Sequence, residues 1–279
     1  QVGDAFARID HLVIDVATTK VLGQPQRAYV SRYALGRDYH KLMRKRLAQL
    51  ARQIEQEVGA FGFRAFVDSA PVMERALAQK AGLGWFGKNA MLLNPQAGSL
   101  FFLGELYTDL PLPVDPPFER EHCGSCSACR TACPTGAIVD DKVVDSRKCV
   151  SYLTIELHGA IPVEYRRAMG NRVYGCDDCQ LVCPWNKFAN AATANRAFAA
   201  REGMRGPVLA ELLTLDDAGF RARFAGSPIK RIGRDRMVRN VMYALGNSGQ
   251  ARLAPFARAL VDDPDAAVAD AARWAVARL

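Results

Sequence analysis

The spacing of apolar residues predicts alternating strands and helices over the first 107 residues. Three short apolar runs are typical of strands: Leu12–Val16, Arg64–Val67 and Leu100–Leu106. Arg44–Val58 repeats its apolar residues at a helical period, and Met73–Ala81 is a second expected helix. This alternation favours an α/β domain at the start of the chain.

From Pro207 onward the pattern is helical. We expect helices over Arg234–Leu245, Gln250–Val261 and Ala266–Leu279, separated by a Gly-Asn-Ser-Gly turn and an Asp-Asp-Pro-Asp turn. This Ala- and Leu-rich rhythm is similar to a HEAT-like repeat, although one or two units are few for a solenoid.

Prolines and cysteines divide the chain further. Residues 111–117 hold four prolines and are expected to form a linker, and all eight cysteines lie between Cys123 and Cys183. We therefore expect an α+β protein with three parts: an α/β domain over 1–117, a cysteine-bearing domain over 118–190 and a helical domain over 191–279.

Composition narrows the class of protein. The net charge of +8 favours an anionic partner, nucleic acid first, although a merely basic soluble protein has the same balance. No apolar run approaches the ~20 residues of a membrane helix, and no signal peptide is evident. Cysteines confined to one region favour metal ligation in a reducing compartment, the cytoplasm. The chain starts without Met, so we expect the true N-terminus to lie upstream.

The cysteine spacing is the strongest chemical pattern. The first run is Cys123-x2-Cys126-x2-Cys129-x3-Cys133-Pro, and the second is Cys149 followed by Cys176-x2-Cys179-x3-Cys183-Pro. A thiolate at every third residue lets one loop hold three corners of a cubane, and the cysteine before proline reaches the other cluster. Zinc sites use CxxC pairs, so zinc is the weaker alternative.

This crossing rule predicts two [4Fe–4S] clusters and their ligands. The first set is Cys123, Cys126, Cys129 and Cys183; the second is Cys133, Cys176 and Cys179, completed by Cys149 as the only cysteine left. Two clusters conduct electrons but do no bond chemistry, so another group must accept the electrons.

Four further segments, with the cysteine runs, closely resemble the epoxyqueuosine reductase family, which is itself similar to the corrinoid reductive dehalogenases. They are residues 29–41, 68–75, 80–89 and 149–156. The resemblance runs from about residue 25 to the end, whereas residues 1–24 fit poorly and the family's usual upstream portion is absent. Part of the cofactor domain is therefore expected to be missing or altered.

The resemblance implies reduction of the epoxide of epoxyqueuosine, at the tRNA wobble position, to the alkene of queuosine, the last step of queuosine biosynthesis. It implies two clusters that feed a cobalamin whose cobalt has no protein histidine ligand. In agreement, no histidine of the chain lies in an Asp-x-His-x-x-Gly pattern. The implied partners are a tRNA anticodon stem-loop and a flavodoxin- or ferredoxin-type electron donor, with the protein acting as a monomer.

Asp68 matches the family's proton donor. A free Asp has a pKa near 3.9, so it can act as an acid at neutral pH only if burial or a nearby negative charge raises that pKa. We expect an apolar wall from Phe66, Val67 and residues 70–72. The residues alone also allow Asp68 or Ser69 to cap the following helix; with the resemblance, we expect Asp68 to be the acid and Ser69 the cap.

Other residues are expected beside the corrin. They are Lys88, Asn89, Tyr152, Glu156, Cys176 and Asp177, together with Asp68. Gly82, Gly84 and Gly87 would allow a flat ligand to approach the backbone, unless they belong to an ordinary loop. For Tyr152 and Glu156 the alternative is helix packing and a solvated face.

Basic residues mark the expected RNA surface. Between Arg221 and Asn240 there are seven Lys or Arg and a single acid, an imbalance that favours phosphate contacts over a solvated helix face. We expect RNA contacts from Arg231, Arg234 and Arg236, and from Arg32 and Arg37, which lie beside Tyr33 and Tyr39. Aromatic and guanidinium planes suit a splayed-out base.

Two other functions compete with this hypothesis. A reductive dehalogenase or other small-molecule reductase has no use for a basic helical tail. A ferredoxin-like electron carrier leaves about one hundred residues or more on each side of the cysteines unexplained.

Overall fold

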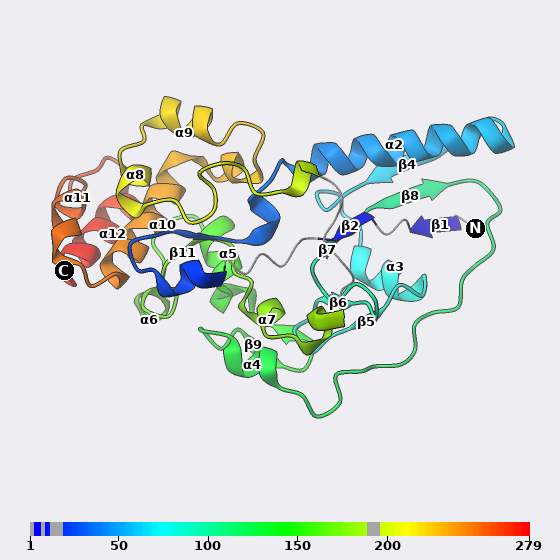
Figure 1. The fold of residues 1–279 in the computed structure, drawn as a ribbon, viewed down its shortest axis with the longest axis horizontal. Helices are drawn as coiled ribbons and strands as arrows, with labels where there is room; N and C mark the ends of the chain where they lie inside the picture. The colour runs from blue at the N-terminus through cyan, green and yellow to red at the C-terminus, as the bar shows by residue number, and fades with distance from the viewer. Residues whose placement is uncertain (1–2, 7–8, 12–18, 189–195) are drawn as a thin grey trace.

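The computed structural model describes residues 3–6, 9–11, 19–188 and 196–279 of the chain. A three-stranded antiparallel sheet lies at one end of the molecule and a group of helices at the other, with the cysteine-bearing segment between and below them (Figure 1). No helix within the described ranges is long and apolar enough to cross a membrane.

The sheet has the strand order β1–β8–β4. β8 (Glu105–Thr108) is the central strand, flanked by β1 (Gly3–Phe6) and β4 (Phe63–Phe66). The long helix α2 (Tyr39–Val58) covers this sheet. Its buried residues recur every fourth position, from Tyr39 through Met43 and Leu47 to Ala51, so one apolar stripe meets the sheet.

Most of the predicted elements of this region are confirmed. β4 matches the strand expected over 64–67, α2 starts five residues before the expected helix at 44, and α3 (Glu74–Lys80) matches the helix expected over 73–81. The single strand expected over 100–106 is wrong: β7 (Phe101–Phe102) pairs with β2 (Ile9–His11), whereas β8 pairs with β1 and β4. The strand expected over Leu12–Val16 lies outside the described residues.

Short paired strands join the rest of the chain. β5 (Trp85–Phe86) and β6 (Leu92–Leu93) form one hairpin, and β9 (Ile138–Asp140) and β10 (Val143–Val144) form another. β3 (Tyr29–Val30) and β11 (Arg172–Tyr174) are parallel, which brings together segments more than 140 residues apart. The cysteine region adds four short helices: α4 (Ala128–Ala132), α5 (Val150–Ile155), α6 (Val163–Arg166) and α7 (Asp178–Leu181).

The C-terminal part is helical, as expected. It contains α8 (Leu209–Leu213), α9 (Asp217–Arg223), α10 (Gly233–Asn247), α11 (Ala254–Arg258) and α12 (Ala266–Val276). The expected helix over 250–261 is shorter, because a 3₁₀ turn at Ala251–Leu253 precedes α11. The other 3₁₀ turns are Val21–Gly23, Arg32–Ala34, Ser146–Lys148, Pro184–Phe188, Arg196–Phe198 and Pro228–Ile232.

α10 is the centre of the larger core. That core also takes in the segment around β3 and the insert between Cys149 and Cys176, so residues of all three predicted domains pack together. Arg239 of α10 is fully buried and donates hydrogen bonds to the carbonyl oxygens of Leu153 and Leu157. The division at 117 and 190 stays a prediction, and its second boundary adjoins residues that the structure does not describe.

Candidate functional site

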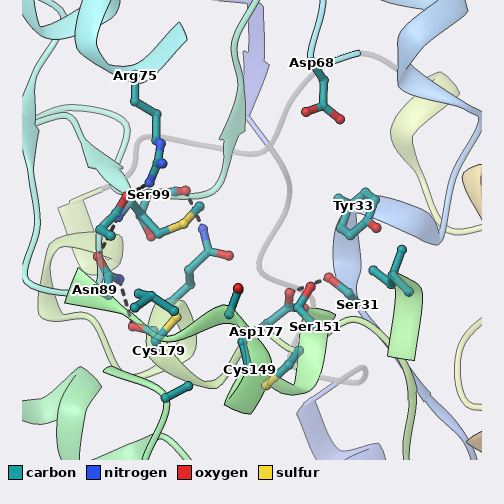
Figure 2. A pocket seen from close by; sticks show the side chains of 18 of the residues that line it. Ser31, Tyr33, Asp68, Arg75, Asn89, Ser99, Cys149, Ser151, Asp177 and Cys179 are labelled. Carbon is teal, nitrogen blue, oxygen red and sulfur yellow. Dashed lines mark hydrogen bonds between the residues drawn. The ribbon is translucent and has the colours of Figure 1, made fainter. Parts of the chain in front are cut away.

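A large cavity lies between the α2 sheet, the cysteine region and the helical part. Its volume is about 1460 Å³, above the ~300–1,000 Å³ of most small-molecule pockets. Asp68 stands on one side with its carboxylate directed into the space, and Cys149, Asp177 and Cys179 lie on the opposite side (Figure 2).

The eight thiols fall into two groups of four. Within the lining of the large cavity are Cys133, Cys149, Cys176 and Cys179, whereas a second cavity of about 70 Å³ is lined by Cys123, Cys126, Cys129 and Cys183. These are the two sets that the crossing rule predicts. No three described His, Cys, Asp or Glu side chains converge tightly enough for a single metal ion; the thiols of each group instead border a common space.

Neighbouring thiols raise one another's pKa, mostly within each group. Burial raises the pKa of Cys183, and the nearby thiols of Cys123, Cys129 and Cys126 raise it further. Burial also raises the pKa of Cys179 to about 12, with Cys149 as the next cause. Buried thiols that crowd one another need a bound positive charge to become the thiolates that ligate metals.

Asp68 sits in a strained loop between β4 and α3. Its φ angle of 50° lies in the left-handed region, which is uncommon for a non-glycine residue. Its carboxylate accepts a hydrogen bond from the Tyr39 hydroxyl and lies 3.4 Å from Nε2 of His40. The other ring nitrogen of His40 lies 2.8 Å from Oδ1 of Asp38. Tyr39 and His40 are the first two residues of α2, and Asp38 is its N-cap. The start of this helix therefore positions the three side chains of Asp38, Tyr39 and His40 beside Asp68.

The surroundings of Asp68 are polar, contrary to the expected apolar wall. The hydrogen bond with His40 lowers the pKa of Asp68 and, although burial opposes it, outweighs that effect. The same hydrogen bond raises the pKa of His40. The expectation of a raised Asp68 pKa is therefore wrong, because Val67 turns into the core and Phe66 packs on Tyr107. Near neutral pH the Asp68–His40 pair can still hold a proton, mainly on the imidazole.

This pair gives a direct spectroscopic prediction. Asp68→Asn should lower the pKa of His40, since a neutral amide no longer stabilises the imidazolium while partial burial still disfavours it and only Asp38 still favours it. Histidine NMR titration measures this value. Asp115→Asn, an exposed linker carboxylate, is the control and should leave the titration unchanged. An unaltered His40 titration in Asp68→Asn would contradict the pairing.

The expected helix cap is also wrong. α3 begins at Glu74 with Met73 at its N-cap and no side-chain cap. Ser69 instead donates to the Val67 carbonyl and accepts from Arg44. The cap fails because three residues separate Ser69 from Met73, too many for its hydroxyl to reach the first turn.

The residues expected beside the corrin divide between two places. Asn89, Glu156, Cys176 and Asp177 line the large cavity. Lys88 does not: it borders the small cavity and lies 3.3 Å from Asp141. Tyr152 is partly exposed on α5 and is also outside the lining of the large cavity. These two placements correct the expectation.

The two acidic residues of this set that line the cavity, Asp177 and Glu156, are hydrogen-bonded or ion-paired within the protein. The carboxylate of Asp177, which is 4% exposed, accepts from Tyr29 Oη at 2.8 Å, Ser31 Oγ at 2.5 Å and the Arg32 N–H at 2.9 Å. It therefore fixes β3 against the loop of Cys176 and Cys179. Glu156 forms a bidentate ion pair with Arg231 on the cavity wall, at 2.6 and 3.0 Å.

The three glycines allow close packing against other parts of the protein: Gly84 and Gly87 within the β5–β6 hairpin, and Gly82 against the linker. A Cβ on Gly84 would come within 1.9 Å of the Leu93 carbonyl oxygen, and one on Gly87 within 2.4 Å of the Leu93 side chain. Gly82 has a φ of 73° and faces Pro116. None of the three lines the large cavity. The structure therefore favours an ordinary loop over a site where a flat ligand approaches the backbone.

The expected RNA residues are only partly at the surface. Arg32 is 3% exposed and donates to Thr19, so its assignment as an RNA contact is wrong: the β3 segment is buried in the larger core. Arg234 bonds Asp263 at 3.1 Å, and Arg236 donates to the Ile155 carbonyl at 2.8 Å. Arg37 and Arg231 are exposed.

Sequence reasoning missed the roles of His40, Glu74 and Glu105 around Asp68. Glu74 accepts the Asp68 backbone N–H, and Glu105 is buried against Glu74. No local pattern connects residues 40, 74 and 105; an acid in an otherwise apolar strand, at Glu105, was the one available indication.

Comparison with known proteins places these features in a family. Residues 122–186 match a 4Fe-4S double cluster binding domain, and residues 8–69 match the family described as epoxyqueuosine reductase QueG, DUF1730. The cysteine region is thus an iron–sulfur domain.

Curated relatives match over most of the chain. An epoxyqueuosine reductase of Pseudomonas aeruginosa is 58% identical over 86% of this chain and 66% of its own length. One from Xanthomonas campestris pv. campestris is 50% identical over 99% of the chain and 77% of its own length. The chain spans about two thirds of the length of the first of these relatives.

Solved structures agree. An epoxyqueuosine reductase bound to an epoxyqueuosine-modified tRNA-Tyr stem loop is 32% identical, with a TM-score of 0.84, over 90% of this chain and 66% of that one. The Bacillus subtilis enzyme, in a structure whose aspartate-bearing catalytic loop is swung out of the active site, is 29% identical, with a TM-score of 0.86, over 99% of this chain and 72% of that one. From its site, its fold and these matches, the chain belongs to the epoxyqueuosine reductase family.

Proposed function

We propose that this protein reduces the epoxide of epoxyqueuosine in tRNA to the alkene of queuosine. One observation carries the proposal: a single large cavity joins the Asp68–His40 pair to the thiols of Cys133, Cys149, Cys176 and Cys179. A proton source and an electron source thus face the same space. The reaction consumes two electrons and two protons and releases the epoxide oxygen as water.

The two thiol groups are proposed to hold one [4Fe–4S] cluster each. Cys123, Cys126, Cys129 and Cys183 would hold the first, and Cys133, Cys149, Cys176 and Cys179 the second. Four thiols around each space suit a cubane. Because Cys126 is exposed, electrons from a flavodoxin- or ferredoxin-type donor would enter at the first cluster and leave through the second.

The residues present also fit a cobalamin in the large cavity. The cavity is larger than a single four-iron cluster requires. The aromatic residues Phe86, Phe101 and Phe102 form part of the cavity wall. His40 is the one histidine in the described lining, and its two ring nitrogens face Asp38 and Asp68, which supports binding without a protein imidazole on cobalt. When bound, cobalamin would supply the low-valent metal that passes electrons to the substrate carbon.

Side chains of the protein would supply the proton that the departing oxygen needs. The Asp68–His40 pair would give a proton to the oxygen as the carbon–oxygen bond breaks, since an alkoxide is a poor leaving group. Tyr39 would hold the Asp68 carboxylate in place through its hydroxyl. Asn89, whose side chain donates to the Cys179 carbonyl at 3.3 Å, would connect the cavity wall with the second cluster.

The basic rim of the cavity is proposed to bind the tRNA. Arg37 and Lys230 are exposed, and the Asp38 N–H donates to Gly226 at 2.8 Å, which joins their two segments. Arg231 lines the cavity beside them. The helical part, proposed as a HEAT-like repeat, would act as the scaffold for this rim. Action as a monomer in the cytoplasm remains a prediction from the resemblance.

Neutralising the rim should weaken RNA binding. We expect Arg37→Ala with Lys230→Ala to lower stem-loop affinity and to reduce the slope of log K against log salt by about two, one for each lost phosphate contact. Fluorescence anisotropy over a salt series measures both quantities. The charge-matched control is Lys45→Ala with Arg258→Ala, two exposed residues of α2 and α11. A rim variant with the control's slope would show that the rim does not contact phosphate.

The direct test of the function is an anaerobic assay. Protein reconstituted with iron, sulfide and cobalamin, and supplied with a chemical reductant, should convert an epoxyqueuosine-containing stem-loop to queuosine, measured by mass spectrometry of the nucleosides. No conversion, together with reduction of a halogenated small molecule, would instead favour the dehalogenase alternative.

A further inference from the structure

Glu105 is a buried carboxyl group without a hydrogen-bond donor. It is 1% exposed, and neither of its oxygens accepts a hydrogen bond from the described residues. Its position on β8 is opposite Phe66 of β4, two residues before Asp68. Glu105 therefore lies beside the end of β4, which leads directly into the segment 67–73, named here the Asp68 loop. An ionised carboxylate in such a place is costly.

Glu74 connects Glu105 to this loop. It is the first residue of α3, lines the large cavity and accepts a hydrogen bond from the backbone N–H of Asp68. Its carboxyl group also contacts that of Glu105. The left-handed backbone of Asp68 is costly and persists only where its surroundings hold it. The hydrogen bond from the Asp68 N–H to Glu74 helps to keep this backbone conformation. It is called the hold on the Asp68 loop below.

A buried carboxyl group in contact with a second carboxyl group shares one proton with it, because ionisation of both is strongly disfavoured at that distance. Burial, then the charge of Glu74, raises the pKa of Glu105 to about 8, and burial raises the pKa of Glu74 as well. A proton on Glu105 can be donated to Glu74. That bond satisfies the orphaned oxygens of Glu105 and leaves Glu74 a negative acceptor for the Asp68 N–H.

Other charged groups face the pair from each side. Arg75, next on α3, and the Asp68 backbone N–H lower the pKa of Glu74, whereas the charge of Asp68 raises the pKa of both glutamates. From α2, Tyr39 and His40 contact the Asp68 carboxylate. Of these groups, His40 also titrates near neutral pH, so a test must separate its effect from that of the carboxyl pair.

We propose that Glu74 is a positioning residue that holds the Asp68 loop in the cavity, and that Glu105 supplies the shared proton on which this hold depends. When the proton is lost, two adjacent negative charges repel each other and the hold weakens. The inference deepens the proposed function by assigning control of its acid. The swung-out catalytic loop of the Bacillus subtilis relative is a second position of such a loop in that protein.

The test is amide hydrogen exchange of the Asp68 loop in the reconstituted protein without substrate, expressed as protection factors between pH 6.5 and 9. In the wild type, protection should fall at least tenfold as the pH rises through about 8. Glu105→Gln should keep the protection and remove most of this pH dependence, because its amide donates to Glu74 at every pH. Glu74→Ala should lose protection throughout, and Glu74→Gln, which keeps an acceptor, should restore part of it.

Glu57→Gln, an exposed change on α2, is the matched control and should behave as the wild type. Two results would overturn the proposal: a pH dependence that survives Glu105→Gln, which would assign it to His40, or full protection in Glu74→Ala. Circular dichroism of each variant separates local opening from global unfolding. Because exchange needs no turnover, these outcomes are independent of whether the protein reduces epoxyqueuosine.

Discussion

Asp68→Asn is expected to lower the single-turnover rate of epoxide reduction by about 10²–10⁴, the usual contribution of a general acid. The amide keeps the shape of the side chain and can still accept from Tyr39, but it can neither hold nor pass a proton. The measurement is made with pre-reduced enzyme and a modified stem-loop, so that electron supply does not enter the comparison. Cluster content, cobalamin and RNA affinity should stay at wild-type levels.

The control for this prediction is Asp115→Asn, which removes an equal charge from the proline-rich linker and should keep the wild-type rate. A near-normal rate in Asp68→Asn would show that the proton comes from another group. Since Asp68 does not cap α3, a loss of rate in this variant cannot be ascribed to a lost helix cap.

Cys149→Ala is expected to abolish turnover and to lower the iron content from about eight to about four atoms per chain, as loss of one four-iron cubane requires. Cys149 lines the large cavity, so the lost cluster is the one that would deliver electrons to the reacting centre. Even a strong chemical reductant should not restore activity. Iron and sulfide analysis with EPR spectroscopy measures which cluster remains.

Cys126→Ala is the matched comparison, because Cys126 lines the small cavity. It should also lose about four iron atoms, but should keep slow turnover with a low-potential chemical donor that reaches the second cluster directly. If Cys149→Ala retained eight iron atoms, or if both variants lost all iron, the assignment of ligands to two independent clusters would be wrong.

The iron–sulfur region could be predicted because cluster binding depends mostly on local cysteine spacing. In the proposed assignment, three thiols of the first cluster and two of the second come from closely spaced cysteines, and the cysteine before proline in each run goes to the other cluster by a known crossing rule. The structure separates the thiols into the same two groups. Helices such as α2 and α10 were predicted for a similar reason: a repeat of apolar residues near 3.6 needs no knowledge of distant contacts.

Charged residues were predicted least well, because burial decides what a charge does. Arg32 and Arg236 belong to the same basic clusters as Arg37 and Lys230, yet the first is buried and the second donates to backbone carbonyls inside the protein. Arg37, Lys230 and Arg231, by contrast, are exposed. A count of charges along a chain cannot separate these cases.

By itself, the sequence determined the two-cluster iron–sulfur region, most of the helices, and Asp68 as the candidate acid through a family resemblance. Only the tertiary structure decided how Asp68 can work. His40 approaches it from α2 and Glu74 from α3, while Glu105 of β8 contacts Glu74. The hydrogen bond with His40, helped by that of Tyr39, reverses the expected shift of the Asp68 pKa. The physical reason is that the pKa depends on charges and donors within a few ångströms, and here the chain brings them from positions up to 37 residues away.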